Sequence, residues 1–177
     1  MNKEEIRENA RKQLHAQSRE EIKEKSQKIM KNLLSIPTLK TAHSIAFYIA
    51  KPYEVDTNYT IQHLLGKKKI AVPVTNSLIR FVEFTSFEHL IKGKFDVFEP
   101  RVRKYIDYTP EVFVIPGITF DEKRSRLGHG KGFYDSFLKD LNAYKIGVCF
   151  DFQIVDKIPH EEHDVDMDKI VSEERII

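Results

Sequence analysis

A glycine-rich basic loop is the part of the chain best suited to chemistry. Residues 124–138 read RSRLGHGKGFYDSFL, in which three glycines alternate with His129 and Lys131. Glycine lets the backbone approach a ligand closely and adopt positive φ angles, and successive N–H groups at the start of a helix bind anions. Arg126 and Lys131 add positive charge beside them. The sequence therefore predicts a phosphate-binding loop that leads into a helix.

Two common phosphate motifs fit this loop less well. The glycines are spaced G-x-G-x-G, whereas a dinucleotide fingerprint reads G-x-G-x-x-G and follows its strand directly. No Ser or Thr follows Lys131 or Gly132 as a Walker A loop requires. A flexible loop with two glycine turns is the alternative to a phosphate site.

Three side chains just after the glycines could complete the site. Asp135 could ligate magnesium carried by phosphates, because Mg²⁺ prefers carboxylates, phosphate oxygens and water. Its alternative role is to stabilise the positive end of the helix dipole. Phe133 and Tyr134 could wall a planar ligand, or they could simply pack as helix residues.

The elements around the loop predict an α/β fold, in which three layers contain a mostly parallel sheet flanked by helices. Short apolar runs typical of buried parallel strands cover residues 44–49, 69–74, 112–116 and 145–150. Segment 79–84 alternates like an edge strand, and residues 168–177 contain a last strand. An N-terminal helical pair is expected over residues 3–35, closed by Pro37. It breaks near residue 17, where Ser18 and Glu21 can form a capping box.

The helices between these strands are expected to be short. Thr57 can cap a helix that runs to about Leu65, with Gly66 ending it, and Ser86 can cap another through about Ile91. A helix is also expected over residues 133–142, whereas residues 93–110 are expected to be irregular. We expect one domain over residues 1–177.

The predicted topology indicates where a ligand binds. In open sheets of this kind, ligands lie outside the carboxyl ends of the strands. Three segments follow such ends and are therefore candidates: residues 51–54, 117–133 and 151–168.

Composition excludes several classes of protein. Apolar residues make up 41% and charged residues 32% of the chain, with a net charge of +2, an ordinary balance for a globular protein. No apolar run approaches the roughly 20 residues of a membrane span, and the N-terminus lacks the apolar core of a signal peptide. We expect a cytoplasmic protein. The one cysteine, Cys149, lies in an apolar run and is expected to be a buried thiol.

The run FVIPGITFDEKRSRLGHGKGFYDSFL, residues 113–138, resembles the signature of the 5-formyltetrahydrofolate cyclo-ligase family, also called 5,10-methenyltetrahydrofolate synthetases. That signature has a strand, a P-G-x-x-F-D turn and then R-L-G-x-G-x-G-Y-Y-D. Further similar segments are KEEIR near the N-terminus, YIAKPYEVDT, and FDFQIVDKIPHEEHDVDMDKIVSEERII at the end. The resemblance thus covers essentially the whole chain, with the segments in the family's order.

The resemblance implies an ATP- and magnesium-dependent cyclisation of 5-formyltetrahydrofolate to 5,10-methenyltetrahydrofolate. The formyl oxygen takes the γ-phosphoryl group of ATP, nitrogen 10 attacks the activated carbon, and ADP and phosphate are released. The protein's task in such chemistry is mainly positioning and charge stabilisation.

The resemblance also implies roles for individual residues. The implied ATP-binding residues are Lys3, Arg7, Arg126, Leu127, Gly128, His129, Gly130, Lys131, Gly132, Phe133 and Tyr134, of which Lys131 and Arg126 are expected to be catalytic. The implied folate-binding residues are Ile49, Glu54, His129, Gly130, Lys131, Gly132 and Phe133, and Phe95 matches a position where some members place a tryptophan. The implied magnesium ligands are Asp135 and Asp168.

Some of these residues have alternative readings or depart from the family pattern. Lys3 and Arg7 share a helix face and could be surface charges, whereas Asp168 could be a turn residue and Glu54 an acid near a helix start. Phe133 replaces the first tyrosine of the family motif. Arg124 stands where the family usually has glycine, and His129 occupies a variable slot.

Two functions of other classes are alternatives. A folate- or nucleotide-binding regulator could have kept the fold and lost turnover. A nucleic-acid-binding protein could use the basic helices and residues 67–69, but acids are interleaved throughout residues 1–31, which disfavours a basic stripe. We expect small-molecule partners, no nucleic acid, no membrane and a monomer.

Overall fold

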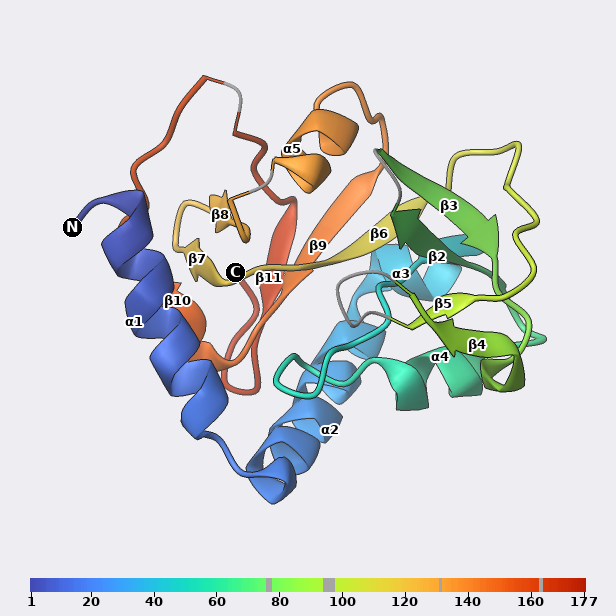
Figure 1. The fold of residues 1–177 in the computed structure, drawn as a ribbon, viewed down its shortest axis with the longest axis horizontal. Coiled ribbons are helices and arrows are strands. Elements are labelled where there is room, and N and C mark those ends of the chain that lie inside the picture. Colours follow the sequence, from blue (N-terminus) through green and yellow to red (C-terminus); the bar gives the residue numbers. More distant parts are fainter. Residues whose placement is uncertain (76–77, 94–97, 131, 163) are drawn as a thin grey trace.

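A central six-stranded sheet organises the computed structural model, which describes residues 1–75, 78–93, 98–130, 132–162 and 164–177 (Figure 1). Its strand order is β11-β9-β6-β1-β2-β3. All neighbours are parallel except β2 and β3, which confirms the mostly parallel sheet and its predicted edge strand. The strands are β1 Ser44–Ala46, β2 Lys69–Thr75, β3 Ile79–Glu83, β6 Val112–Pro116, β9 Tyr144–Val148 and β11 Lys169–Val171.

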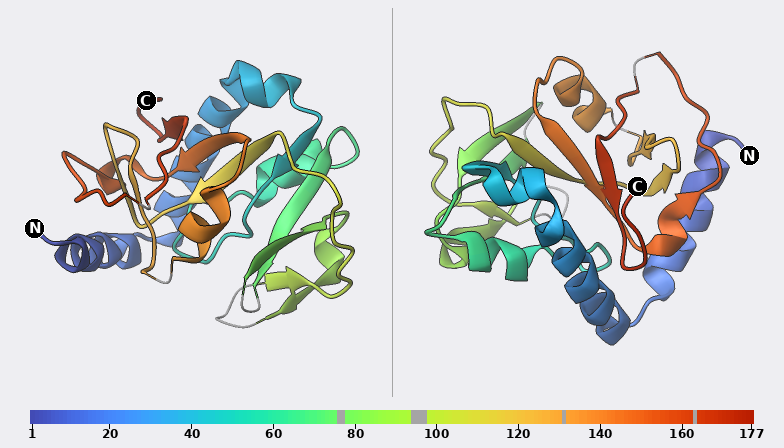
Figure 2. Two further views of the ribbon diagram at one scale, coloured as in Figure 1. Left: turned by 90° about the horizontal axis from the view of Figure 1, so that it is seen from above. Right: turned by 180° about the vertical axis from the view of Figure 1, so that it is seen from behind.

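Helices cover both faces of this sheet (Figure 2), as the α/β prediction requires. Successive side chains of a strand point to opposite faces, so β6 feeds two cores. Val112 and Val114 pack in one cluster, whereas Phe113 and Ile115 pack in the other. The first cluster includes residues of α2 Arg19–Ser35, α3 Pro37–Thr41 and α4 Asn58–Leu64, and the second includes Leu138 of α5 Phe133–Leu138.

The N-terminal helical pair confirms its predicted break. Helix α1 spans Lys3–Ala16 and begins with a capping box of Asn2 and Glu5, and α2 begins with the predicted capping box of Ser18 and Glu21. Helix α2 ends at Ser35, and Pro37 then starts the short helix α3, because proline is well tolerated in a first helical turn.

Two smaller sheets lie beside the central one, and both were missed by the sequence analysis. One has the order β10-β7-β8, with bounds Ile154–Val155, Thr119–Asp121 and Arg126–Leu127. The other pairs β4 Leu90–Lys92, where the end of a helix was expected, with β5 Phe98–Pro100, within the stretch expected to be irregular. Strands of two or three residues are too short to show a periodicity of their own.

Two helices are shorter than predicted. The helix capped by Ser86 is only a 3₁₀ turn, η1 Phe87–His89, because the chain then enters strand β4. Helix α5 ends at Leu138 instead of reaching residue 142. In the parts of the chain that the structure describes, no helix has the length and apolarity needed to cross a membrane.

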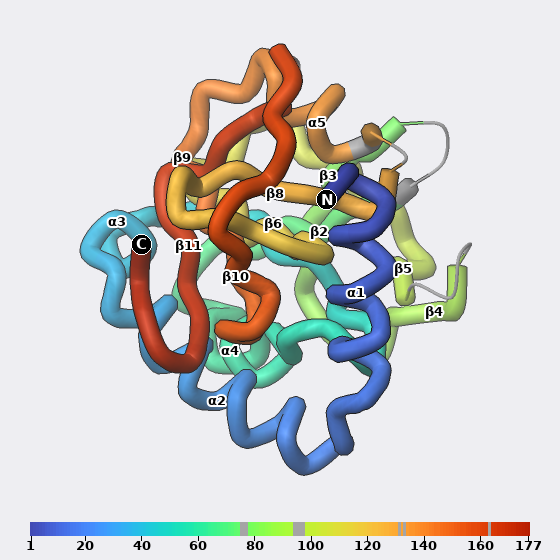
Figure 3. The backbone as a smooth tube through the Cα atoms, turned by 90° about the vertical axis from the view of Figure 1, so that its left-hand side faces the viewer, coloured from blue at the N-terminus to red at the C-terminus, as the bar shows by residue number. Residues whose placement is uncertain are grey.

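Helix α1 packs against the β7–β8–β10 side of the molecule, as the tube view shows (Figure 3). Its Ile6 is buried with Leu127 of β8 and Ile158, beside Val155 of β10. The N-terminus of the chain therefore lies next to the segment that leads into the glycine loop.

Candidate active site

A buried aspartate fixes the hairpin from which the glycine loop departs. The side chain of Asp121 accepts hydrogen bonds from the backbone N–H groups of Lys123 and Ser125, both at 3.0 Å, and of Ile158 at 2.9 Å. Arg124, in the same turn, has φ 70°. It adopts the left-handed backbone region that favours glycine, at the position where the resemblance implies that the family usually has glycine.

Each glycine of the loop is favoured at its position for a structural reason of its own. Gly130 and Gly132 have φ angles of 95° and 65°, a region that favours glycine. A Cβ on Gly128 would lie only 2.9 Å from Nη1 of Arg126. Gly132 is the N-cap residue of α5, so the loop leads directly into the helix, as the sequence predicted.

Arg7 brings helix α1 to the glycine loop. Its Nε donates a hydrogen bond of 3.0 Å to the carbonyl of Gly128, and its Nη1 pairs with Glu4 at 3.0 Å. A Cβ on Gly130 would lie 3.5 Å from Cζ of Arg7. The structure therefore places Arg7 beside the loop backbone, and its nucleotide-binding role stays a prediction.

Lys3, one turn earlier on α1, contacts acidic residues instead. Its Nζ lies 2.7 Å from Oδ2 of Asp164 and 3.0 Å from Oε1 of Glu161. Burial lowers the pKa of Lys3, but the hydrogen bonds to Asp164 and Glu161 outweigh it and raise the pKa above its ordinary value. Lys3 is therefore a firmly charged group that ties α1 to the segment before β11.

Arg126 is a buried cation at the start of the loop, with 2% of its side chain exposed. Its Nη2 lies 2.7 Å from Oδ1 of Asp135, and its Nη1 lies 3.5 Å from the carbonyl of Pro116. Its Nε is buried without a hydrogen-bond partner among the described residues. The guanidinium also lies 5.4 Å from the ring centroid of Tyr134. Burial raises the pKa of Tyr134 despite the opposing charge of Arg126, so its phenol is neutral at physiological pH.

The two predicted magnesium ligands have different surroundings. Asp135 is 20% exposed and offers its second oxygen beside the Arg126 pair. Asp168 accepts a hydrogen bond of 2.7 Å from the backbone N–H of Lys145 and lies 3.5 Å from its Nζ. No group of three or more His, Cys, Asp or Glu residues is placed to hold a metal within the described ranges. One or two carboxylates suffice when phosphate oxygens complete the coordination, so either carboxylate alone is chemically suited to magnesium delivered with ATP. Among the described residues, no contact joins Asp135 to Asp168.

A small, shallow cleft lies beside Glu54, and the space of about 260 Å³ within it includes open solvent. Each of the three segments that follow strand ends contributes to its lining, through Glu54, Gly117 and Gln153. Tyr48 and Tyr53 also line it. This arrangement agrees with the expectation that ligands bind outside the carboxyl ends of parallel strands.

Glu54 connects the cleft to the glycine loop. Its side chain is 14% exposed, its Oε2 accepts a hydrogen bond of 2.9 Å from the backbone N–H of Lys51, and its Oε1 lies 3.8 Å from Nε2 of His129. Ile49, the other predicted folate contact outside the loop, is buried in the core beyond β1. The structure thus brings Glu54 and His129 together from two distant segments.

The remaining predicted site residues are only partly described by the structure, and the cleft also contains residues for which no role was predicted. Lys131 and Phe95 lie outside the described residues, and Phe133 begins α5. The structure also places Tyr48, Gly117 and Gln153 in the cleft. No individual role was predicted for them, although Gly117 and Gln153 lie in the candidate segments 117–133 and 151–168. A glutamine in the run FDFQIV was the one available signal, because an amide among apolar residues just after a strand needs partners when buried.

Comparison with known proteins gives the fold and site their context. A model of the 5-formyltetrahydrofolate cyclo-ligase family matches residues 1–173. The chain belongs to this family. Among its relatives, the 5-formyltetrahydrofolate cyclo-ligase of Escherichia coli K12 is 28% identical over 168 residues, covering 89% of this chain and 92% of the relative. A probable 5-formyltetrahydrofolate cyclo-ligase of Schizosaccharomyces pombe is 30% identical over 178 residues, covering 88% and 87%.

Solved structures of the family share the fold. The NMR structure of Aquifex aeolicus 5,10-methenyltetrahydrofolate synthetase is similar with a TM-score of 0.87 and 30% identity, over 99% of this chain and 92% of that chain. A 5,10-methenyltetrahydrofolate synthetase of Mycoplasma pneumoniae gives a TM-score of 0.79 and 26% identity, over 98% and 99%. The family resemblance read from the glycine loop is therefore confirmed over the whole chain.

Proposed function

We propose that this cyclo-ligase family member converts 5-formyltetrahydrofolate to 5,10-methenyltetrahydrofolate with the hydrolysis of ATP to ADP and phosphate. The observation that carries the proposal is the contact between His129 of the glycine loop and Glu54 of the cleft, at 3.8 Å. It makes the predicted nucleotide loop and the predicted folate carboxylate neighbours. A reaction that joins a phosphoryl group of one ligand to an oxygen of another requires such neighbouring sites.

In the proposed reaction, the glycine loop and the cleft have different roles. The formyl oxygen attacks the γ-phosphorus of ATP and ADP leaves, which turns a poor leaving group into phosphate. Nitrogen 10 then attacks the activated carbon, loses its proton, and phosphate departs as the ring closes. In this proposal the carboxylate of Glu54 accepts hydrogen bonds from the pterin-like ring and fixes its orientation.

The glycine loop supplies the charge stabilisation in this proposal. Backbone N–H groups of residues 128–132 and the side chains of Arg7, Lys131 and His129 would face the phosphates. The buried Arg126 would act beside them while it holds Asp135. Magnesium neutralises phosphate charge when bound with ATP, and we assign Asp135 and Asp168 to hold it.

An absorbance assay for methenyl-folate formation tests the proposal. Purified protein is given 5-formyltetrahydrofolate with ATP and magnesium, and each is then omitted in turn. We expect product only in the complete mixture, with one phosphate released per product formed. Binding of both ligands without product or phosphate would instead identify a regulator that has lost turnover.

We further propose a monomeric, single-domain cytoplasmic enzyme with small-molecule substrates and no nucleic-acid or membrane partner. Size-exclusion chromatography with light scattering tests the monomer. Binding to RNA or DNA that weakens steeply with salt would contradict the proposed absence of a nucleic-acid partner.

A further inference from the structure

Gln153 makes an unusually complete set of hydrogen bonds for a residue without an assigned role. It ends the 3₁₀ helix η3 Asp151–Gln153, and only 3% of the residue is exposed. Its Nε2 donates to the carbonyl of Gly117 at 3.0 Å and to that of Ile118 at 2.9 Å. Its Oε1 accepts from the backbone N–H of Phe150 at 2.8 Å. Both amide hydrogens are therefore engaged, which leaves no donor for a ligand.

The turn that Gln153 holds is the junction between the two predicted substrate sites. On the cleft side, Gly117 lies in the lining together with Glu54. On the loop side, the N–H of Ile118 donates to the carbonyl of Leu127 at 2.8 Å, and Arg126 approaches the carbonyl of Pro116. A displacement of residues 116–118 would therefore move the glycine loop relative to the cleft.

The same turn cannot easily relax on its own. A Cβ on Gly117 would lie 2.6 Å from the ring of Phe120, so the backbone of this glycine is packed directly on an aromatic side chain. Interiors this dense transmit small shifts instead of absorbing them. Loss of the two bonds from Gln153 should consequently displace the turn as a unit.

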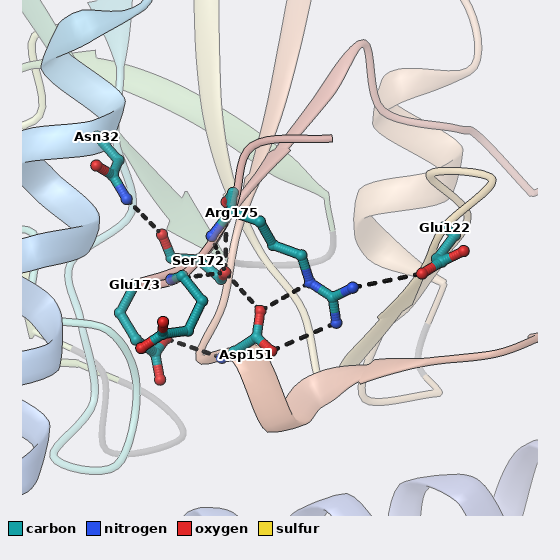
Figure 4. A network of polar contacts seen from close by, with 7 residues as sticks. Asn32, Glu122, Asp151, Ser172, Glu173 and Arg175 are labelled. Atoms are coloured by element: carbon teal, nitrogen blue, oxygen red, sulfur yellow. Dashed lines mark hydrogen bonds and ion pairs between the residues drawn. The ribbon is translucent and has the colours of Figure 1, made fainter.

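The C-terminal segment holds η3 in place from the other side (Figure 4). Oδ1 of Asp151 accepts hydrogen bonds from Oγ of Ser172 at 2.7 Å and from Nε of Arg175 at 2.9 Å. The backbone N–H of Asp151 donates to Glu173 at 2.8 Å. Gln153 thus projects from a fixed support, and its amide can define the position of the turn.

We propose that Gln153 is a positioning residue that sets the distance between the nucleotide loop and the folate cleft. It acts through the Gly117 and Ile118 carbonyls and does not touch either substrate. The proposal rests on the proposed function, because phosphoryl transfer between ligands on the two sides of this turn is what needs the positioning. A misplacement of about 1 Å can cost roughly 100-fold in rate.

Gln153→Met tests the proposal, because methionine has a similar shape and lacks the amide. The turnover number kcat is measured by methenyl-folate absorbance, and the dissociation constants of ATP and of 5-formyltetrahydrofolate are each measured alone by calorimetry. We expect kcat to fall by roughly 10- to 100-fold, with both dissociation constants within about threefold of those of the parent. Gln153→Asn, which keeps an amide that is one methylene too short, should show a smaller loss and serves if the methionine variant does not fold.

Ser44→Ala is the matched control, because the buried Oγ of Ser44 accepts a hydrogen bond of 3.2 Å from the N–H of Glu111 at the start of β1, away from η3 and from the cleft. It should lower the melting temperature but keep kcat at temperatures well below unfolding. If kcat of the Gln153 variants matches the parent, or falls only in step with melting temperature as in Ser44→Ala, the residue is merely structural. A rise in the folate dissociation constant that accounts for the lost activity would make Gln153 a folate ligand. A parent protein without turnover would instead overturn the proposed function itself.

Discussion

Glu54 is the residue whose replacement should best separate the two substrates. Its Oε2 accepts the Lys51 N–H bond, which a glutamine oxygen can also accept, so Glu54→Gln should preserve the local turn. One acceptor becomes a donor facing ring N–H groups, and hydrogen bonds to charged groups contribute about 1.5–3 kcal/mol. We expect the KM for 5-formyltetrahydrofolate to rise roughly 10- to 100-fold, whereas ATP affinity measured by calorimetry should hardly change.

Asp56→Asn is a suitable control for this prediction. Asp56 belongs to the same loop, and its Oδ1 accepts a hydrogen bond of 2.9 Å from the N–H of Asn58, which an asparagine oxygen can also accept. Its kinetics should match those of the parent. Equal damage to folate and ATP binding by Glu54→Gln would show that Glu54 supports the fold or the metal instead.

Asp135 has two candidate partners, and magnesium dependence can distinguish them. Asp135→Asn removes a charge that pairs with the buried Arg126 at 2.7 Å and also weakens any metal site. If Asp135 holds magnesium, the variant should lose most of its activity and recover part of it at higher magnesium, because a weakened site refills by mass action. Activity is measured over a magnesium titration at saturating ATP.

Asp168→Asn should show the same kind of magnesium rescue with a smaller loss. Its carboxylate already accepts the Lys145 N–H bond, and an asparagine oxygen can keep that bond. If neither variant changes the magnesium dependence, the carboxylates are not metal ligands. Asp135 would then serve chiefly to neutralise Arg126, and Asp168 to join β9 and β11.

At the scale of elements, the glycine loop can be tested through its backbone geometry. Gly132 has φ 65° and no heavy atom within 4 Å of a Cβ placed there, and Gly66 after α4 has φ 78° and is equally open. Alanine at either position therefore adds only backbone strain, about 1–2 kcal/mol. Gly132→Ala and Gly66→Ala should lower the free energy of unfolding by similar amounts, measured by urea denaturation.

Only the loop variant should affect the nucleotide. Gly132→Ala should raise the KM for ATP, because the loop cannot keep its N–H groups directed at the phosphates, whereas Gly66→Ala should leave it unchanged. An unchanged ATP KM in Gly132→Ala would mean that the shape of the loop at this position does not matter for phosphate binding.

The sequence predicted those elements that carry a clear local pattern, such as an apolar run of five or six residues or a capping box. The apolar runs at residues 69–74 and 112–116 became β2 and β6, and the Ser18 capping box began α2. Thr57 precedes α4 as predicted, but its side chain makes no cap bond and donates to the carbonyl of Tyr48. Tertiary contacts of this kind cannot be seen in local propensity, and neither can the short strands β7 and β8.

The sequence predicted where the site lies, but not the long-range hydrogen bonds and ion pairs that hold it in place. The strand-end rule selected three segments, and each lends a residue to the cleft. The bonds of Gln153 reach carbonyls 36 and 35 residues earlier, and Lys3 pairs with Asp164 across 161 residues. Such pairings depend on the assembled fold, so motif and resemblance gave Lys3 a nucleotide role without indicating its acidic partners.

At the scale of the whole molecule, the N-terminal helix and the C-terminal turn both contact the elements around the predicted ligand site, at the carboxyl ends of the strands. Arg7 of α1 holds the glycine loop, and the Ser172–Arg175 turn holds η3, which in turn supports the cleft through Gln153. Ligands that bind between these parts should therefore stabilise the entire fold and not only the loop, since they bind the native state alone.

Cys149 provides a probe of this coupling. It is fully buried in the cluster beneath α5, and its N–H donates to the carbonyl of Val171 between β9 and β11. Burial, reinforced by the negative charges of Glu173 and Asp151, raises the pKa of its thiol well above the ordinary value. The unfolded thiol therefore loses its proton first, and this residue's contribution to the free energy of unfolding should decline as pH rises above about 8.5.

The native thiol should react with an uncharged disulfide reagent only when the sheet opens. At a fixed pH near 8, ATP with magnesium at ten times its dissociation constant should slow labelling about elevenfold, the factor 1 + [L]/Kd for a ligand that binds only the folded state. The rate is followed by release of the reagent's chromophore, and urea should accelerate it with the slope of global unfolding. Labelling that is insensitive to both ATP and urea would show that Cys149 is exposed by a local opening of the β9–β11 side, so that the ligand edge and this side of the sheet are not one cooperative unit.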